Sequence, residues 1–306
     1  MKFSDKKTVL IITGPTAVGK SAVAIRIAKY FDTEIISADS RQCYRELNIG
    51  VARPSRSELN EVIHHFIASH SIQEEVTVAG FEQYALQKAA ALFQQHDTIV
   101  MVGGTGLYVK AFCEGLDEIP PVKPGVRSTI NVNYKERGLA WLQQEVQQKD
   151  PAFYKAGEIK NPQRMMRALE VLESTGRSIL SFHKGEKAKR NFTIIGAGLE
   201  LPRQELNRNI NSRVDQMMEN GLLDEVRSLL PNKNMNALQT VGYTELFEFL
   251  DGKIVLEKAI EQIRSNTRKY AKRQLTWFRK DKSLQWFRPD QVEEIIQLVT
   301  RSADPA

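Results

Sequence analysis

The octapeptide GPTAVGKS directly follows the apolar run VLIIT and fits the phosphate-binding pattern G-x-x-x-x-G-K-[ST] in full. A glycine-rich turn between a strand and a helix points several backbone N–H groups at one place, and the helix dipole adds about half a positive charge there. Lys20 adds a full positive charge, and Ser21 adds a hydroxyl group suited to Mg²⁺. The predicted chemistry is the binding of phosphates or of a nucleotide. The loop residues are Gly14, Pro15, Thr16, Ala17, Val18, Gly19, Lys20 and Ser21.

Two further segments bear on the compound that carries those phosphates. Nucleotide-hydrolysing enzymes with this loop have a second apolar strand that ends in an acidic residue, which holds Mg²⁺. The candidate strand here, TIVMV, ends in Gly103-Gly104-Thr105-Gly106, and no Asn-Lys-x-Asp motif for guanine is present. Asp39 instead follows the segment EIISA, on the same rim of the predicted sheet. At this position Asp39 fits a capping or Mg²⁺-ordering carboxylate as well as a catalytic one.

The elements that must position these residues alternate between strand and helix patterns in the first third of the chain. Short β-branched runs occur at KTVLIITG, EIISADS and DTIVMVGG, separated by the helical segments SAVAIRIAKYF and VAGFEQYALQKAAALFQQ. This alternation predicts an α/β fold of the P-loop NTPase-like class, a parallel sheet flanked by helices with right-handed crossovers. Ligands are expected at the carboxyl ends of the strands.

The alternation of strand and helix patterns ends at the proline-rich segment IPPVKPG. A long stretch with helical periodicity and no convincing strand follows. A strand pattern returns at FTIIGAGLEL. We therefore predict a helical insertion at 117–191 between two parts of one core, 1–116 and 192–306. After the insertion, one buried face of an amphipathic helix is predicted, formed by Leu206, Ile210, Val214 and Met217.

A basic and aromatic arm, RSNTRKYAKRQLTWFRKDKSLQWFR, carries nine Lys or Arg residues against one acidic residue near the end of the chain. Helical spacing places Arg264, Arg268 and Lys272 on one stripe, with Lys269 and Arg273 beside it. Such a stripe can follow a nucleic-acid backbone, or it can be a solvated helix face. The aromatic residues fit base stacking or, more simply, the core; they are Tyr270, Trp277 and Phe278.

Composition excludes several classes of protein. Apolar residues make up 42% and charged residues 26% of the 306, which is typical of a folded globular enzyme. No apolar run approaches the ~20 residues of a membrane span, and no signal-peptide core precedes the first strand, so a cytoplasmic protein is expected. The cysteines, Cys43 and Cys113, form neither a disulfide framework nor a zinc motif. The net charge of +6 agrees with an anionic partner.

Seven segments in the same order resemble one family, the tRNA dimethylallyltransferases, also called tRNA isopentenyltransferases. The phosphate loop is shared by many families, but the ADSRQ and GGTGLY blocks that follow it are more specific. Together the segments span nearly the whole chain. They are GPTAVGKS, ISADSRQCYRELNIGVARP, VGGTGLYVKA, NPQRMMRALEVLESTG, NSRVDQMMENGL, VGYTELFEFLDG and TRKYAKRQLTWFRK.

The resemblance implies an enzyme that moves a dimethylallyl group from dimethylallyl diphosphate to N6 of adenosine 37, the nucleotide 3′-adjacent to the anticodon, in tRNAs that read codons starting with U. In that family the phosphate loop holds the diphosphate of the prenyl donor, with Mg²⁺ near Ser21. The insertion is implied to contact the tRNA anticodon stem-loop. A monomer that binds no membrane is expected.

The same resemblance assigns roles to individual residues. Asp39 matches the general base, Thr16 lies near the bridging oxygen of the donor, and Arg213 reaches the diphosphate. The positions implied to contact tRNA are Asp39, Ser40, Arg41, Gln42, Thr105, Arg127, Gln163, Arg164, Met165, Met166 and Arg167. The chain departs from the family pattern at Val18, where a small hydroxyl residue is usual, and at EIKNPQR, where a common H-P-N-D segment is shortened.

Two alternatives use the same motifs differently. A small-molecule P-loop kinase would use the insertion as a lid over ATP and would phosphorylate its substrate. A non-catalytic RNA-binding switch would bind RNA under nucleotide control and form no covalent product. Neither alternative accounts for the ADSRQ and GGTGLY blocks together.

Overall fold

The computed structural model describes residues 7–157 and 159–303. The chain forms two compact units, of which the first comprises Met1–Glu114 with Lys189–Ala306 and the second comprises Gly115–Ala188. Within the described residues, no helix combines the length and the apolar character needed to cross a membrane. The chain thus leaves the first unit once and returns to it.

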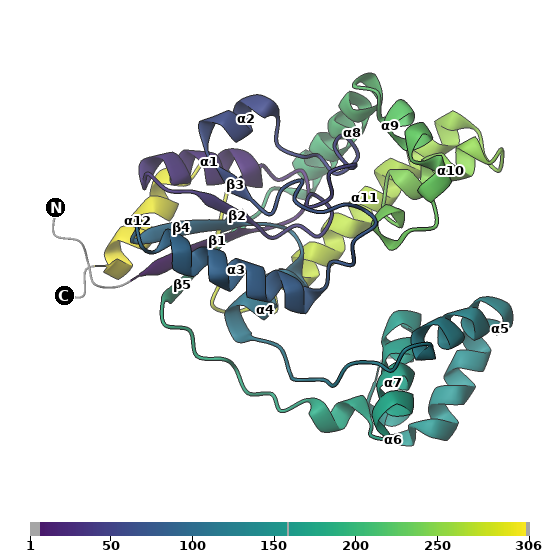
Figure 1. Ribbon diagram of the computed structural model, residues 1–306. Helices are drawn as coiled ribbons and strands as arrows, with labels where there is room; N and C mark the ends of the chain where they lie inside the picture. The colour runs from purple at the N-terminus through teal and green to yellow at the C-terminus, as the bar shows by residue number, and fades with distance from the viewer. Residues whose placement is uncertain (1–6, 158, 304–306) are drawn as a thin grey trace. The chain divides into compact units, whose positions relative to one another are not determined.

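A parallel sheet forms the centre of the first unit, and its six described strands follow the order β3-β2-β4-β1-β5-β6 (Figure 1). The predicted strands at β1, β2, β4 and β5 are confirmed, and β5 pairs directly with β1 after the insertion. The strands β3 and β6 were not predicted, because β3 has only two residues and β6 lies within the basic and aromatic arm. The bounds are β1 (Thr8–Thr13), β2 (Ile35–Ser37), β3 (His64–His65), β4 (Thr98–Val102), β5 (Thr193–Leu199) and β6 (Gln285–Phe287).

Helices cover both faces of this sheet. In Figure 1, α1 and α12 lie on one face, and α3 and α4 lie on the other. Val9 and Ile11 of β1 belong to the core cluster on the α3 side, whereas Leu10 and Ile12 belong to the cluster on the α1 side. Both faces are buried, so β1 is apolar throughout rather than alternating. The bounds are α1 (Lys20–Tyr30), α2 (Arg56–Glu61), α3 (Val78–Leu92), α4 (Gly106–Glu114), α8 (Arg203–Glu219), α9 (Leu222–Ser228), α10 (Tyr243–Leu250), α11 (Leu256–Phe278) and α12 (Val292–Ala303).

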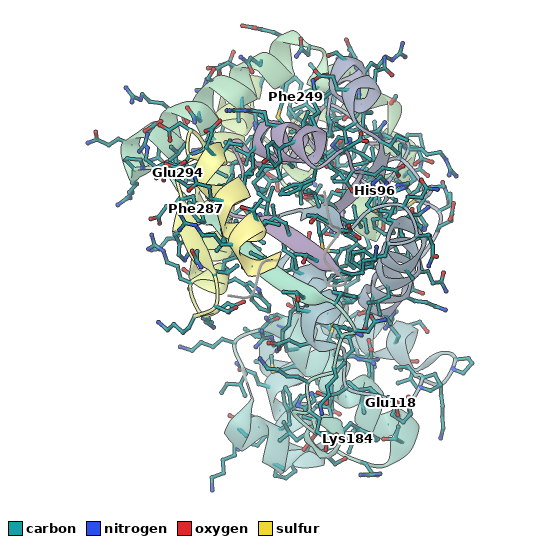
Figure 2. All side chains as sticks on the ribbon, turned by 90° about the vertical axis from the view of Figure 1, so that its left-hand side faces the viewer. His96, Glu118, Lys184, Phe249, Phe287 and Glu294 are labelled. Carbon is teal, nitrogen blue, oxygen red and sulfur yellow. The ribbon has the colours of Figure 1, made fainter. Side chains whose placement is uncertain are left out.

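The amphipathic helix predicted after β5 is α8. Its residues Leu206, Ile210 and Val214 are buried, and Met217 is half-buried, as its 3.6-residue spacing predicts. Figure 2 labels Phe287 of β6 and Glu294 of α12, and Phe287 packs against the core cluster to which α12 contributes. The C-terminal part of the chain therefore completes the core of the first unit.

The second unit is helical. Its core is a cluster around Trp141, Leu142 and Leu169, and α5 changes direction at Gly138, whose φ of 76° is non-helical. The segments that enter and leave the unit are joined by a hydrogen bond of 2.9 Å from the Lys184 N–H to Asp117 Oδ1; Figure 2 labels Lys184 and the neighbouring Glu118. The helix bounds are α5 (Val126–Lys149), α6 (Pro151–Ala156) and α7 (Pro162–Thr175).

Candidate active site

The phosphate-binding pattern forms a loop between β1 and α1. Gly14 has φ 139° and lies so close to β5 that a Cβ there would stand 2.5 Å from the Leu199 carbonyl oxygen. Gly19, with φ 100°, precedes α1, and no side chain caps the helix. The first amides of α1 are therefore left to bind an anion, which is the arrangement that phosphate sites at helix N-termini use.

Lys20 points back into this loop. Its ammonium donates to the carbonyl oxygens of Gly14, at 3.0 Å, and Pro15, at 2.8 Å. Burial and the neighbouring Arg213 lower the pKa of Lys20 to about 7, against a smaller opposing effect of Asp39. A bound diphosphate would counter both effects and favour the charged lysine.

Thr16 and Arg213 meet at the mouth of the loop. Arg213 Nη1 of α8 donates to Thr16 Oγ1 at 3.3 Å, and burial lowers the pKa of Arg213 below its ordinary value. Two cations, Arg213 and Lys20, are thus brought to one short segment of backbone. Such a pair is stabilised by a ligand that carries more than one negative charge.

Asp39 follows β2 and performs the capping role that its position allowed. Its Oδ1 accepts hydrogen bonds from the backbone N–H groups of Arg41, at 2.9 Å, and Gln42, at 3.2 Å. The N–H group of the next residue, Ser40, donates to Thr105 Oγ1 of the loop after β4 at 3.0 Å. The turn that presents Asp39 is therefore fixed by its own carboxylate and by a second loop.

A cavity of about 560 Å³ in the first unit is lined by several of these residues. Asp39 and Thr16 both line it, together with Arg213. Tyr270 of α11 also lines it, and burial, with Asp39 nearby, raises the pKa of Tyr270 to about 12. The remaining lining residues are Ser40, Arg41, Gly50, Val51, Ala52, Val214, Met217, Gln239, Thr240, Val241, Gly242, Thr244, Glu245, Ile263, Asn266, Thr267 and Arg273.

The side-chain amide of Gln42 supports a wall of this cavity. Gln42 Nε2 donates to the carbonyl oxygens of Val51, at 3.1 Å, and Ala52, at 3.0 Å. Gln42 itself is not among the lining residues. The Gln42 amide thus supports the wall, and the contact of Gln42 with tRNA that the resemblance implied stays a prediction.

A partly buried hydrogen-bond network holds the segment that leads into the same wall. Glu225 of α9 accepts hydrogen bonds from the N–H groups of Asn48, Ile49 and Gly50 and from the Tyr243 hydroxyl, at 2.6–3.2 Å. Burial and the Glu225 carboxylate raise the pKa of Tyr243 above its ordinary value. One carboxylate therefore satisfies four donors.

We expect Glu225→Ala to lower the free energy of unfolding by about 3 kcal/mol, because the buried Tyr243 hydroxyl and the partly buried N–H groups of Ile49 and Gly50 lose their acceptor, and a buried donor without one costs roughly 1–3 kcal/mol. Urea denaturation measures this change. Glu219→Ala, an exposed position near the end of α8, is the control. A Glu225→Ala protein as stable as the wild type would contradict the role of this network.

The basic arm is divided between α11 and the segment after it. Arg264 forms an ion pair with Asp215 of α8, and Arg268 donates to Asn211 at 2.8 Å, so the first part of the predicted stripe packs on α8. Lys272 is exposed and forms no ion pair within 7–157 and 159–303. Of the aromatic residues, Phe278 is buried in the core, whereas Tyr270 and Trp277 are each 37% exposed.

Within the second unit, two of the residues implied to contact tRNA are arranged around one buried carboxylate. Arg127 Nε donates to Glu170 Oε1 at 3.2 Å, and Arg167 Nη1 donates to Glu170 Oε2 at 3.3 Å. Glu170 is only 5% exposed, so these ion pairs fix both guanidinium groups on one side of α7.

The first turn of α7 separates the other implied contacts. Gln163 and Arg164 are exposed, but Met165 and Met166 are 0% and 4% exposed and belong to the core of the second unit. Helical geometry turns consecutive residues to different faces. The Met165 and Met166 side chains therefore pack in the core of the second unit, and the tRNA contact implied for these two residues stays a prediction.

The sequence patterns missed one face of α11. Asn266, Thr267 and Gln274 lie beside Tyr270 on the side of the helix that faces the loops of the site. The signal that could have found Asn266 and Gln274 is their spacing of four residues on either side of Tyr270, which places all three on one helix face. The predicted stripe drew attention to the neighbouring basic face instead.

The similarities of this chain to known proteins agree with this arrangement. A family model described as IPP transferase matches residues 42–281. A tRNA dimethylallyltransferase of Christiangramia forsetii is 49% identical over 280 residues, which cover 92% of this chain and 93% of that protein. A tRNA dimethylallyltransferase of Cytophaga hutchinsonii is 44% identical, with 98% of each chain covered.

Solved structures extend the likeness to the fold. A tRNA isopentenylpyrophosphate transferase of Bacillus halodurans is 33% identical and matches with a TM-score of 0.72 over 97% of each chain. A eukaryotic dimethylallyltransferase that acts on tRNA is 23% identical, with a TM-score of 0.76 over 97% of this chain and 77% of that chain, and supports the fold. On the family model and these relatives together, the chain belongs to the IPP transferase family.

Proposed function

We propose that the protein transfers a dimethylallyl group from dimethylallyl diphosphate to N6 of the tRNA adenosine 3′-adjacent to the anticodon, in tRNAs that read codons starting with U. One observation carries the proposal: Thr16 of the phosphate loop, the cation Arg213 and a candidate base, Asp39, line the same cavity. Membership of the IPP transferase family agrees with it.

The acceptor amine needs help from a base. The exocyclic nitrogen of adenine is a poor nucleophile, since its lone pair is delocalised into the ring, and attack becomes easier when a base removes the proton as the bond forms. Asp39 takes that proton. The backbone N–H groups of Arg41 and Gln42 occupy its Oδ1, so Oδ2 is the oxygen assigned to proton removal.

The donor side stabilises a leaving group. As the N6–carbon bond forms, the allylic C–O bond breaks, and its electron pair remains on the diphosphate. Lys20, Arg213, the Thr16 hydroxyl and the loop amides face this growing negative charge. Preorganised charges of this kind are commonly the largest contribution to catalysis.

The residues at the loop fit a Mg²⁺ ion bound mainly through the substrate. Among the described residues there is no group of three or more His, Cys, Asp or Glu that could hold a metal. Mg²⁺ at phosphate sites characteristically keeps several waters and binds substrate oxygens with few protein ligands. Ser21, next to Lys20 at the start of α1, would hold it. Its chemistry there would be to neutralise the charge of the diphosphate.

In this proposal each unit contributes its own contacts to the tRNA. The target base lies in a stacked loop, so it must be extruded to reach Asp39. Exposed residues of the second unit, Gln163 and Arg164, with Arg127 and Arg167, contact the anticodon stem-loop. Around the cavity, Ser40, Arg41 and Thr105 complete the contacts. A monomer in the cytoplasm is part of the proposal.

Lys272→Gln is expected to weaken tRNA binding a few-fold and to reduce the slope of log affinity against log salt by about 1, because one phosphate contact is lost. Filter binding over a salt series measures the slope. Lys258→Gln, exposed at the other end of α11, should leave the slope unchanged. Equal slopes for wild type and Lys272→Gln would remove Lys272 from the RNA surface.

A direct assay separates the proposal from the kinase and RNA-switch alternatives. The protein is incubated with Mg²⁺, tRNA and either dimethylallyl diphosphate or ATP, and tRNA-dependent release of pyrophosphate is followed. We expect tRNA-dependent release of pyrophosphate with dimethylallyl diphosphate and none with ATP. A covalent product that requires ATP would support the kinase, and binding of tRNA without any product would support the switch.

A further inference from the structure

The side chain of Gln274, on α11, lies between the loop after β1 and the loop after β4. Its Oε1 accepts the Thr16 N–H at 2.8 Å, and its Nε2 donates to the Gly104 carbonyl oxygen at 3.0 Å. The residue is only 7% exposed. Both polar ends of a buried amide are thus used, one on each loop.

The glycines after β4 make this approach possible. A Cβ at Gly104 would stand 2.2 Å from Gln274 Nε2, and a Cβ at Gly103 would stand 2.2 Å from the Ala38 carbonyl oxygen. A Cβ at Gly106 would stand 2.1 Å from Trp277 Nε1, also of α11. The glycine block therefore lets α11 and the loop after β2 close onto the end of β4.

The bridge sets the orientation of Thr16. The Thr16 N–H donates to Gln274 Oε1, and the Thr16 hydroxyl accepts a hydrogen bond from Arg213 at 3.3 Å. Thr16 is held by its backbone on one side and by its side chain on the other. Loss of the Gln274 contact would free the backbone N–H and allow the hydroxyl to turn away from the cavity.

The Gln274 side chain is uncharged, which favours the binding of a diphosphate beside it. A Cβ at Gly104 would be 3.7 Å from Lys20 Nζ, so the Gln274 amide and the ammonium lie close to the same point. In nucleotide-hydrolysing relatives of this fold an acidic residue ends the equivalent strand. An amide supplies hydrogen bonds here without opposing a diphosphate.

We propose that Gln274 is a positioning residue for the donor diphosphate, which fixes Thr16 and the phosphate loop against the end of β4. The inference deepens the proposed function and rests on it for the identity of the donor. Binding of the diphosphate group itself is tested separately with inorganic pyrophosphate.

Two substitutions test the bridge. Gln274→Met keeps the length and removes both hydrogen bonds, and we expect kcat/KM for dimethylallyl diphosphate to fall on the order of 10²-fold while KM for tRNA stays unchanged. Gln274→Glu keeps an acceptor for Thr16 but adds a charge, and we expect it to weaken pyrophosphate binding more than Gln274→Met does. The matched control is Gln262→Glu, the same change on the same helix.

A double-mutant cycle gives a readout that a general loss of stability would not produce. Gly104→Ala pushes against Gln274 and is expected to weaken pyrophosphate binding. In a Gln274→Ala background the obstructing amide is gone, so the added Gly104→Ala should have no further effect. Calorimetric titration with pyrophosphate and Mg²⁺ measures all four proteins, and thermal melting checks that each is folded.

Three results would overturn the inference. The first is an unchanged kcat/KM for dimethylallyl diphosphate in a folded Gln274→Met protein, and the second is a rise in KM for tRNA as large as the fall in that kcat/KM. The third is additive effects of the two substitutions on pyrophosphate affinity in the double-mutant cycle. Failure of the proposed function appears differently. In that case the wild type gives no prenylated tRNA, whereas its pyrophosphate binding still depends on Gln274.

Discussion

Asp39→Asn is expected to lower the rate of prenyl transfer on the order of 10³-fold, within the range that a general base contributes, while tRNA affinity stays at its wild-type value. Asparagine keeps an oxygen that accepts the N–H groups of Arg41 and Gln42, so the turn after β2 is retained. Its amide cannot take the proton from N6. The loss is therefore confined to the chemical step.

Single-turnover rates and filter binding of tRNA separate these quantities. Asp39→Ala should lose activity as well, and it also removes the acceptor of the two hydrogen bonds, which makes the asparagine variant the cleaner test. Asp224→Asn, at a carboxylate 79% exposed on α9, is the matched control. Full activity in Asp39→Asn would exclude Asp39 as the base.

Lys20→Met is expected to weaken pyrophosphate binding on the order of 10²-fold, since truncating one partner of a buried, hydrogen-bonded charge pair costs about 2–5 kcal/mol. Methionine fills much of the same space, and the loop glycines are untouched. Calorimetric titration measures the affinity. Lys29→Met, at the exposed end of α1 where Lys29 pairs with Glu61, is the control. Unchanged affinity in Lys20→Met would place the diphosphate elsewhere.

The pH dependence of this binding follows from the pKa of Lys20, about 7 in the free protein. Below that pH the lysine is already charged. Above it, binding of the anion must bring a proton to Lys20, so affinity falls with rising pH, by up to about tenfold per unit. The ratio of wild-type to Lys20→Met affinity at each pH removes the titration of pyrophosphate itself. A ratio that stays constant from pH 6 to 9 would contradict the prediction.

Local patterns explain which parts of the fold were predictable. The phosphate loop, the strands β1, β2, β4 and β5, and α8 each have a periodicity or a turn signature contained in a few consecutive residues. Asp39 could be placed on the rim of the sheet because the carboxyl ends of parallel strands share one edge. Its capping bonds follow from residues only two and three positions away.

The parts that escaped prediction depend on contacts between distant segments. Gln274 meets Thr16 across 258 residues of sequence, and a glutamine within a helix carries no signal of its partner. Arg264 and Arg268 share a stripe with Lys272, but whether a basic stripe faces solvent or another helix depends on packing. Here α8 supplies Asp215 and Asn211 as partners.

The resemblance to a family identified segments but not which of their side chains are exposed. It assigned a contiguous block, Gln163 to Arg167, to tRNA, whereas α7 directs Met165 and Met166 into the core of the second unit. A motif identifies a segment, and helical geometry decides which of its side chains can reach a ligand. The exposed and paired positions around the methionines are the ones to test.

The central claim is that the phosphate loop holds a leaving diphosphate while Asp39 activates an adenine amine. Mass spectrometry of nucleosides from tRNA treated with the protein, Mg²⁺ and dimethylallyl diphosphate tests it most directly. The claim predicts that one adenosine beside the anticodon gains one dimethylallyl group in place of a hydrogen, and that Asp39→Asn gives none. An unmodified adenosine in the wild-type reaction, or a phosphorylated product formed from ATP, would contradict it.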